Sequence, residues 1–245
     1  MGGSLPIIKS LWIGSALGAI ERLALKSFLA NGHRVQLFVY DRVEAVPTGV
    51  EIRDASDVLP KHQTFTYKKF GSYAAFANWF RYEMLYLKGG IWVDTDVICL
   101  KPFVFDRTFI AGWQSFNLVN NAVLGGEKGD PLFRFLSLGC QEPNTIQPFD
   151  GHHVRRKKRI RRFFRGNAIG DLDWGETGPR ALTKALCHFG RLQLAMPTTA
   201  FYPIHHECFH TFFDTTYKVP ELYFPDSYAI HVWNEMLRRQ TSINK

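Results

Sequence analysis

Two aspartates separated by one residue, Asp94 and Asp96, have the clearest potential for chemistry in this sequence. They follow a short apolar run at residues 91–93 that predicts a strand. In an extended segment residues i and i+2 point the same way, so both carboxylates face one side of the strand end. Hard oxygen ligands of this kind suit Mg²⁺ or Mn²⁺, which keep phosphate oxygens and waters as their other ligands. The pair therefore predicts a metal site.

An aspartate pair of this spacing is common in proteins, so its context has to support the assignment. The sequence contains a second copy, Asp171-Leu172-Asp173. The first copy follows a predicted helix, a double glycine and an apolar strand, whereas the second follows Gly170 in a polar stretch. We therefore assign the metal to Asp94 and Asp96 and leave the role of Asp171 and Asp173 open.

The elements around the first pair alternate between strand and helix, which is typical of an α/β fold with one mixed sheet flanked by helices. Strands at 10–13 and 36–40 with a helix at 19–31 between them predict a crossover unit, the pattern of nucleotide-binding folds. The strongest helix, at 72–88, ends at Gly89-Gly90 and leads into the strand that carries Asp94. Open α/β sheets bind ligands at the carboxyl ends of their strands, where this pair lies. Further strands are expected at 109–112, 122–124 and 228–233, and further helices at 131–140 and 179–189.

A phosphatase of the haloacid dehalogenase class is the alternative function. Residues 91–97 fit the nucleophile motif of that class, which is also a strand followed by Asp-x-Asp. However, that motif normally ends the first strand of its fold, and a later acidic pair completes the metal site. Here two predicted strands precede the motif, and no convincing acidic pair follows it.

The segment from Asn78 to Asp96, NWFRYEMLYLKGGIWVDTD, resembles the signature of glycosyltransferase family 32, the sugar transferases with a DXD motif. The family includes α-1,4-galactosyltransferases, initiating mannosyltransferases, and bacterial transferases of capsule, polysaccharide and lipopolysaccharide biosynthesis. The resemblance implies a GT-A fold, a UDP- or GDP-linked sugar donor, a divalent cation (Mn²⁺ or Mg²⁺) and hexose transfer with retention to a saccharide or lipid-linked saccharide acceptor. Other fragments occur in the family's order, so that the resemblance covers almost the whole chain: residues 11–14, 120–123, 177–179 and 231–233.

The resemblance also implies roles for individual residues. The residues expected to act in the reaction are Asp94, Asp96 and Arg81, and the metal ligands are Asp94, Asp96 and His231. The donor-binding set comprises Trp12, Ile13, Asn78, Arg81, Asp94, Thr95, Asn121, Gly178 and Trp233.

Four of these residues also have a structural interpretation. Arg81 either binds a phosphate or sugar through its planar guanidinium or supports Asp94 by a salt bridge. His231 is either a neutral imidazole ligand or a structural histidine. Trp12 either contacts the nucleotide base or packs in the core. Trp233 likewise either covers the donor as a lid or packs in the core.

Asn78 and Gly178 are further members of the donor-binding set. Asn78 stands where many family members carry aspartate, so a role that depends on charge is in doubt there. Gly178 precedes Pro179 at a helix start, whose free amides either receive a substrate or simply begin a helix. No residue can be named as the nucleophile. Glu176, Asp171 and Asp173 are the acids nearest the fragment 177–179, but retaining transfer by front-face attack needs no enzyme nucleophile.

The net charge of +8 comes from a single segment. Residues 151–166 contain eight Arg and Lys and no acid, and the remaining 22 basic residues balance the 22 acidic ones. Apolar residues within 154–165 alternate with the cations, which favours a peripheral contact with an anionic membrane. An inert solvated loop and a nucleic-acid patch are the alternatives; no nucleic-acid motif accompanies the run, so we expect no such partner.

The length and composition place limits on the remaining classes. A chain of 245 residues with 46% hydrophobic content is expected to form one domain over 1–245. No apolar run is long enough to span a bilayer, and the N-terminus does not have the pattern of a secretory signal, so we expect a cytoplasmic enzyme, in peripheral contact with the inner face of the plasma membrane. The four scattered cysteines are expected to be reduced and buried.

Overall fold

The computed structural model describes residues 5–67, 71–165, 172, 175–214 and 224–237. Its central feature is a six-stranded sheet with the strand order β3-β2-β1-β4-β7-β6. The first four strands in this order run parallel to one another, and β7 runs antiparallel to both of its neighbours, β4 and β6. The strands are β1 (Ile8–Trp12), β2 (Val35–Val39), β3 (Val50–Asp54), β4 (Gly90–Val93), β6 (Ile110–Ser115) and β7 (Leu118–Gly126).

The strand order reverses between β1 and β4. The chain passes from β1 through α1 (Ala19–Ala30) to β2 and β3, and then returns to place β4 on the other side of β1. A reversal of this kind opens a crevice at the carboxyl ends of the two neighbouring strands, which is where doubly wound sheets bind nucleotides. By this rule the ligand-binding position is expected between Trp12, at the end of β1, and Asp94, just beyond the end of β4.

Two buried polar side chains attach β1 to the segment that carries the aspartate pair. The Lys9 Nζ donates to the carbonyl of Gly89 at 2.6 Å, and the Ser10 hydroxyl donates to the carbonyl of Val93 at 2.7 Å. Burial lowers the pKa of Lys9, with a smaller contribution from the charge of Lys88. These bonds explain how two polar residues are accommodated in a strand that is buried almost throughout.

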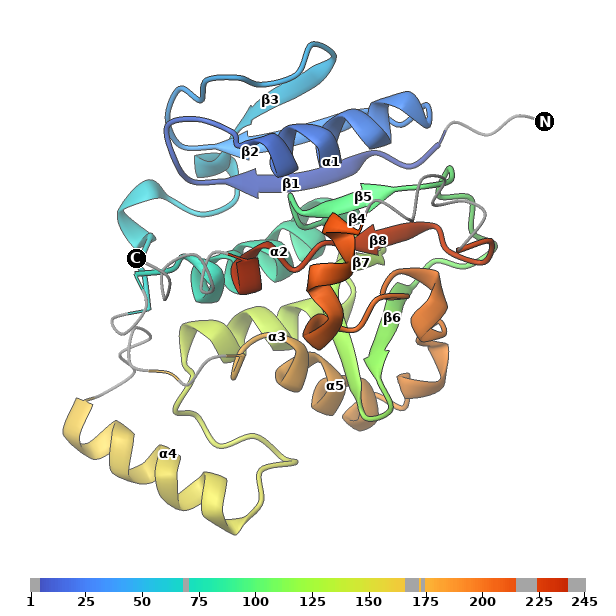
Figure 1. The fold of residues 1–245 in the computed structure, drawn as a ribbon. Coiled ribbons are helices and arrows are strands. Elements are labelled where there is room, and N and C mark those ends of the chain that lie inside the picture. The colour runs from blue at the N-terminus through green and yellow to red at the C-terminus, as the bar shows by residue number, and fades with distance from the viewer. Residues whose placement is uncertain (1–4, 68–70, 166–171, 173–174, 215–223, 238–245) are drawn as a thin grey trace.

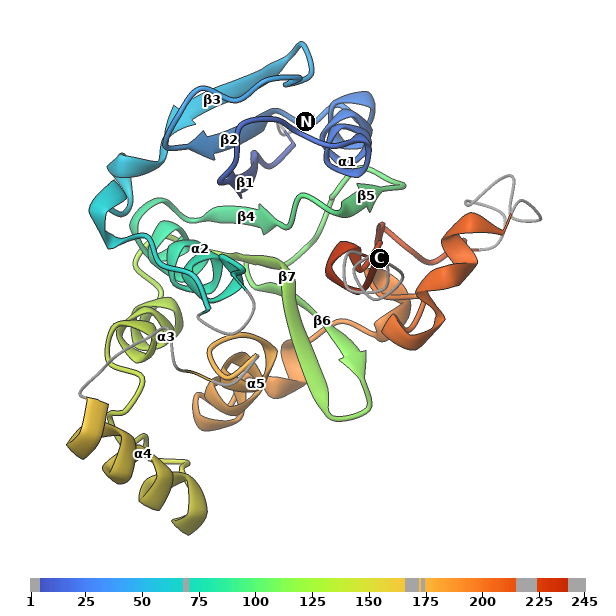
Figure 2. The same cartoon turned by 60° about the vertical axis from the view of Figure 1, so that its left-hand side comes forward.

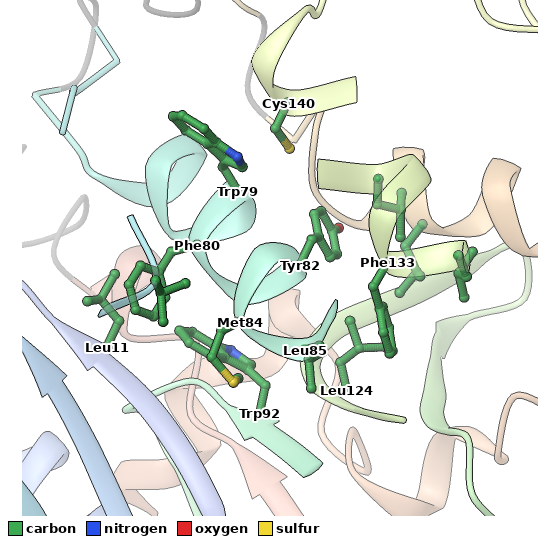
Figure 3. Packing of buried hydrophobic residues seen from close by; sticks show 14 of the residues in the cluster. Leu11, Trp79, Phe80, Tyr82, Met84, Leu85, Trp92, Leu124, Phe133 and Cys140 are labelled. Atoms are coloured by element: carbon green, nitrogen blue, oxygen red, sulfur yellow. The ribbon is translucent and has the colours of Figure 1, made fainter. Parts of the chain in front are cut away.

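The helix α2 (Ala74–Lys88) is buried on nearly all sides, between the sheet and α3 (Pro131–Gln141). Figure 3 shows Phe80 directed toward Leu11, and Tyr82 toward Phe133 and α3. Each fully buried aromatic or large aliphatic side chain stabilises the fold by roughly 1.5–3 kcal/mol, so this helix is fixed firmly in place. Gly89 ends it with φ at +59°, where an added Cβ would lie 2.6 Å from the backbone nitrogen of Lys128.

The helices α3 and α5 (Pro179–His188) lie on the same side of the sheet as α2. Beyond them α4 (His152–Arg165) stands at the edge of the molecule in both ribbon views (Figures 1 and 2). Within the described part of the chain, no helix combines the length and apolarity needed to cross a membrane.

A second, two-stranded sheet modifies the predicted single mixed sheet. It pairs β5 (Val97–Cys99) with β8 (Ala229–His231) in antiparallel register. Because β5 follows Asp96 directly, this pairing brings the C-terminal part of the chain to the aspartate pair. The short 3₁₀ helices are η1 (Ala55–Asp57), η2 (Lys61–Gln63), η4 (Leu192–Leu194), η5 (Thr198–Ala200) and η6 (His206–Phe213).

Most predicted elements are present, with ends shifted by one or a few residues. No pattern in the sequence predicts β3 or β5, because both are short and β3 is polar and mostly exposed. The cysteines only partly match the prediction. All four are free thiols, but Cys187 and Cys208 are exposed because they lie on the outer sides of α5 and η6.

Candidate active site

Asp94, Asp96 and His231 come together in one cluster. Each offers a ligand atom, and the three atoms lie within 4.8 Å of one another. The His231 Nε2 is 3.2 Å from the Asp96 Oδ1. Two carboxylates and an imidazole within this distance can hold a divalent cation. The structure therefore brings together the three residues predicted as metal ligands.

Backbone pairing positions Asp96 and His231 against each other. His231 is paired with Val97 across β5 and β8, and the amide of Val232 donates to the carbonyl of Asp96 at 2.9 Å. The amide of Asn234 donates to the Asp96 Oδ2 at 2.9 Å. The side chain of Asn234 in turn donates to the buried carboxylate of Glu21 on α1. The Asp96 carboxylate is thus fixed by the C-terminal segment.

The carboxylate of Asp94 is fixed from the other side. The Arg81 Nη2 and the Trp92 Nε1 both donate to its Oδ1, each at 2.7 Å. The Arg81 guanidinium also lies 5.0 Å from the centre of the Trp92 ring. Among the described residues no hydrogen bond is directed at Oδ2, which leaves the lone pairs of that oxygen for a cation.

The electrostatics of the cluster match a site for positive charge. Burial raises the pKa of Asp94, and the charge of Asp96 adds to this effect while Arg81 opposes it. Burial acts in the same direction on Asp96, but the charge and hydrogen bond of His231 outweigh it and lower the pKa. Burial would lower the pKa of His231, yet the charge of Asp96 raises it. A cation at this position would relieve the repulsion between the two carboxylates.

Arg81 is buried and bonded within the protein. Only 3% of the residue is exposed, and besides Asp94 it donates from Nη1 to the carbonyl of Asn121. These contacts favour the structural interpretation, in which Arg81 supports Asp94, over direct contact with the donor. Arg81 thus connects the backbone of Asn121 to the carboxylate of Asp94.

Asn78 belongs to the same buried network. Its Oδ1 accepts from the Nδ2 of Asn121 at 2.9 Å, and its Nδ2 donates to the hydroxyl of Thr177 at 3.3 Å. A Cβ at Gly178 would lie 3.0 Å from the Asn78 Nδ2, so glycine allows this close approach. The amide at position 78 is suited to this network because it both donates and accepts.

Trp12 and Ile13 are half-buried at the end of β1, which pairs with β4. The Trp12 Nε1 is buried and has no hydrogen-bond partner among the described residues. Thr95 is half-buried between the two aspartates. The donor-binding roles of Trp12, Ile13 and Thr95 stay predictions.

Trp233 packs on His231. The two rings have their centres 4.1 Å apart, and the indole Nε1 donates to the carbonyl of Ile204 at 3.0 Å. Its φ of +59° is unusual for a bulky residue, a strain that tends to occur at functional sites. This packing restricts the imidazole, and the expected role of Trp233 as a lid over the donor stays a prediction.

Sequence reasoning missed three residues that hold the site. The helix predicted at 72–88 and the apolar run at 91–93 do not show that the Trp92 indole donates to Asp94 or that the Tyr82 hydroxyl accepts from Asn121. Asn234 directly follows the recognised 231–233 fragment, which was the only available signal. Asp171 and Asp173 lie outside the described residues.

Two family models match the two parts of the chain that supply the residues of this site. The first, described as the glycosyltransferase sugar-binding region containing the DXD motif, matches residues 34–116. The second, the alpha 1,4-glycosyltransferase conserved region, matches residues 170–245. The first range contains Asp94 and Asp96, and the second contains His231. Neither match supports the phosphatase alternative.

Curated relatives agree with these matches. A lactosylceramide 4-alpha-galactosyltransferase of Rattus norvegicus is 29% identical over 167 residues, which is 63% of this chain and 39% of the relative. The Homo sapiens protein of the same name is 27% identical over 168 residues, 63% of this chain and 40% of the relative. The matches thus span about two fifths of the length of these relatives.

Among solved structures, the ligand-free glycosyltransferase domain of the YGT toxin matches with a TM-score of 0.51 and covers 80% of each chain. At 9% identity this match supports the fold alone. The mainly parallel sheet, its reversal at β1 and β4, and the aspartate pair beyond β4 all agree with it. With the two family models, they identify the chain as a glycosyltransferase with a DXD motif and a GT-A fold.

Proposed function

We propose that the chain is a metal-dependent transferase that moves a hexose, with retention, from a UDP- or GDP-linked donor to a saccharide acceptor. The observation that carries this proposal is the cluster of Asp94, Asp96 and His231 beyond the end of β4, where the strand order reverses between β1 and β4. A nucleotide at that position would place its diphosphate near the two carboxylates. The carboxylates cannot bind phosphate directly because both groups are negative, so the arrangement favours a cation between them.

The ligand set suits Mn²⁺ or Mg²⁺. The two carboxylates fit both ions, and the imidazole of His231 favours Mn²⁺ because nitrogen ligands suit transition metals better. When bound, such a cation neutralises the charge that develops on the leaving diphosphate.

The protein's own groups hold the ligands in position. Arg81 and Trp92 fix Asp94, the Asn234 amide fixes Asp96, and Trp233 packs on the imidazole. Side chains that are fixed before the donor binds need no reorganisation during the reaction.

Retention without an enzyme nucleophile agrees with the described part of the site. Asp94 and Asp96 are assigned to the cation. Glu176 is the remaining candidate nucleophile among the described residues, and its carboxylate accepts two hydrogen bonds, of 2.6 and 3.0 Å, from Arg161 on α4. A carboxylate held this way is a poor nucleophile. We therefore propose front-face attack, in which the leaving phosphate takes the acceptor's proton.

The names of the relatives suggest the substrates. They are lactosylceramide 4-alpha-galactosyltransferases, so we propose an α-galactosyl donor as the first to test and the saccharide headgroup of a lipid as the acceptor class. Acceptors in capsule or lipopolysaccharide biosynthesis belong to the same chemical class.

A thermal-shift panel tests the proposal. Purified protein is melted with UDP, GDP or ADP, each with Mn²⁺, with Mg²⁺ or with EDTA. A nucleotide at 100 times its dissociation constant stabilises by about 2.7 kcal/mol, and we expect this only for UDP or GDP with metal present. Stabilisation by phosphate-mimicking fluorides and by none of the nucleotides would favour a phosphatase instead.

A further inference from the structure

We propose that the outward face of α4 docks on an anionic membrane surface. This inference goes beyond the proposed transfer reaction and does not depend on it. The helix spans His152–Arg165 and stands at the edge of the molecule, beyond α3 and α5 (Figures 1 and 2). Its two sides differ in what they contact.

One side of α4 is attached to the protein. Lys158 is buried and forms an ion pair of 2.7 Å with Asp150, and Arg161 forms one of 2.6 Å with Glu176. The Arg155 Nε donates to the carbonyl of Asp150 at 2.6 Å. Residues 154, 158 and 161 are four and three apart, so they share one helix face. These contacts fix the orientation of the helix on the protein.

The opposite side is apolar where a soluble surface would be polar. Ile160, Phe163 and Phe164 are 48%, 84% and 75% exposed. Their spacing of three and four residues places them on one face, and Ile160 lies two residues from Lys158, so that face points away from the protein. The two phenylalanine rings contact each other edge to face, with centres 5.0 Å apart. Among the described residues, none of the three belongs to a buried apolar cluster.

Exposed cations lie next to the strip and elsewhere on the helix. Arg156, Lys157, Arg159 and Arg162 are all exposed, and residues 151–165 contain no acid. An apolar strip bordered by cations is the arrangement of helices that lie in the headgroup region, where the rings enter the acyl boundary and the cations meet anionic lipid. A nucleic acid would use the cations and would stack on aromatic rings, but it would not use the aliphatic Ile160.

The test is co-sedimentation of the full chain with vesicles of phosphatidylcholine alone and of phosphatidylcholine with phosphatidylglycerol, over a salt series. One variant removes the rings, Phe163→Ser with Phe164→Ser. A second removes exposed charge, with Arg156, Arg159 and Arg162 each changed to Gln. Both leave the Lys158 and Arg161 ion pairs in place. The matched controls are Phe116→Ser, at a fully exposed phenylalanine in the β6–β7 turn, and Lys26, Arg107 and Lys128 each changed to Gln.

We expect binding to the anionic vesicles that weakens with salt. Each cation contributes about fivefold, so the triple charge variant should bind roughly a hundredfold more weakly. The ring variant should lose at least about tenfold. The control variants should bind like the wild type, and circular dichroism should be unchanged in all of them.

Equal binding to neutral and anionic vesicles, or equal loss in the matched controls, would overturn the proposal. So would binding of RNA or DNA that depends on the same residues and exceeds binding to anionic vesicles. Because sedimentation requires no sugar transfer, failure here leaves the proposed function untouched.

Discussion

Replacing Arg81 with lysine separates two roles that the sequence left open. The side chain donates from one nitrogen to Asp94 and from another to the carbonyl of Asn121, and it packs on the Trp92 ring. Lysine keeps the charge but cannot reach both acceptors with the same geometry. The variant therefore leaves one buried acceptor unsatisfied.

The magnitude follows from these contacts. An unsatisfied buried acceptor costs about 1–3 kcal/mol, and loss of the guanidinium from the Trp92 ring costs roughly 0.5–1 kcal/mol more. For a chain of this size about 2–3 kcal/mol corresponds to a fall in Tm of roughly 5–10 °C. Because Asp94 loses its orientation, Mn²⁺ affinity should also fall, by roughly 10- to 100-fold.

The assay combines thermal unfolding of the metal-free protein with calorimetric titration of Mn²⁺ in the presence of UDP. The control is Arg34→Lys, at an exposed arginine that pairs with Glu51, where we expect a change within about 0.5 kcal/mol. If Arg81→Lys keeps the stability and Mn²⁺ affinity of the wild type and loses only donor use, then Arg81 contacts the donor and this reasoning is wrong.

Three further outcomes are expected. Asp96→Ala should abolish sugar transfer while the metal-free protein keeps its fold, because a metal ligand is removed and like-charge repulsion is relieved; full activity would remove Asp96 from the site. Trp92→Phe keeps a buried aromatic ring but loses the bond to Asp94, so Mn²⁺ affinity measured by calorimetry should fall roughly tenfold, and an unchanged affinity would show that the bond does not orient the ligand. His231→Gln should weaken Mn²⁺ more than Mg²⁺ in initial-rate assays, since nitrogen ligation favours the transition metal, and equal effects on both ions would make His231 a structural residue.

Local patterns were sufficient to predict three of the four parallel strands, β1, β2 and β4. The crossover unit from β1 to β2, the helix α2 and the strand β4 each have clear apolar spacing and glycine stops, so they could be read from single segments. The metal site at Asp94 and Asp96 could be predicted because the two aspartates come directly after β4.

The remainder depended on contacts between distant segments. The pairing of β5 with β8 joins residues 97–99 to 229–231. A strand at 228–233 is predicted, but β5 is too short to be predicted, and neither segment shows that the two pair. His231 was therefore placed only through the family resemblance. The buried roles of Arg81 and Asn78 depend on Asn121 and Thr177, which a helical pattern at 72–88 cannot show.

Binding of Mn²⁺, followed by electron paramagnetic resonance, tests the central claim most directly. The account predicts one tight Mn²⁺ per chain whose affinity increases with UDP or GDP, and loss of that site in the isosteric double variant Asp94→Asn with Asp96→Asn, whose fold is checked by circular dichroism. A wild-type protein that binds no Mn²⁺ with either nucleotide, or a double variant that binds it as tightly as the wild type, would contradict the account.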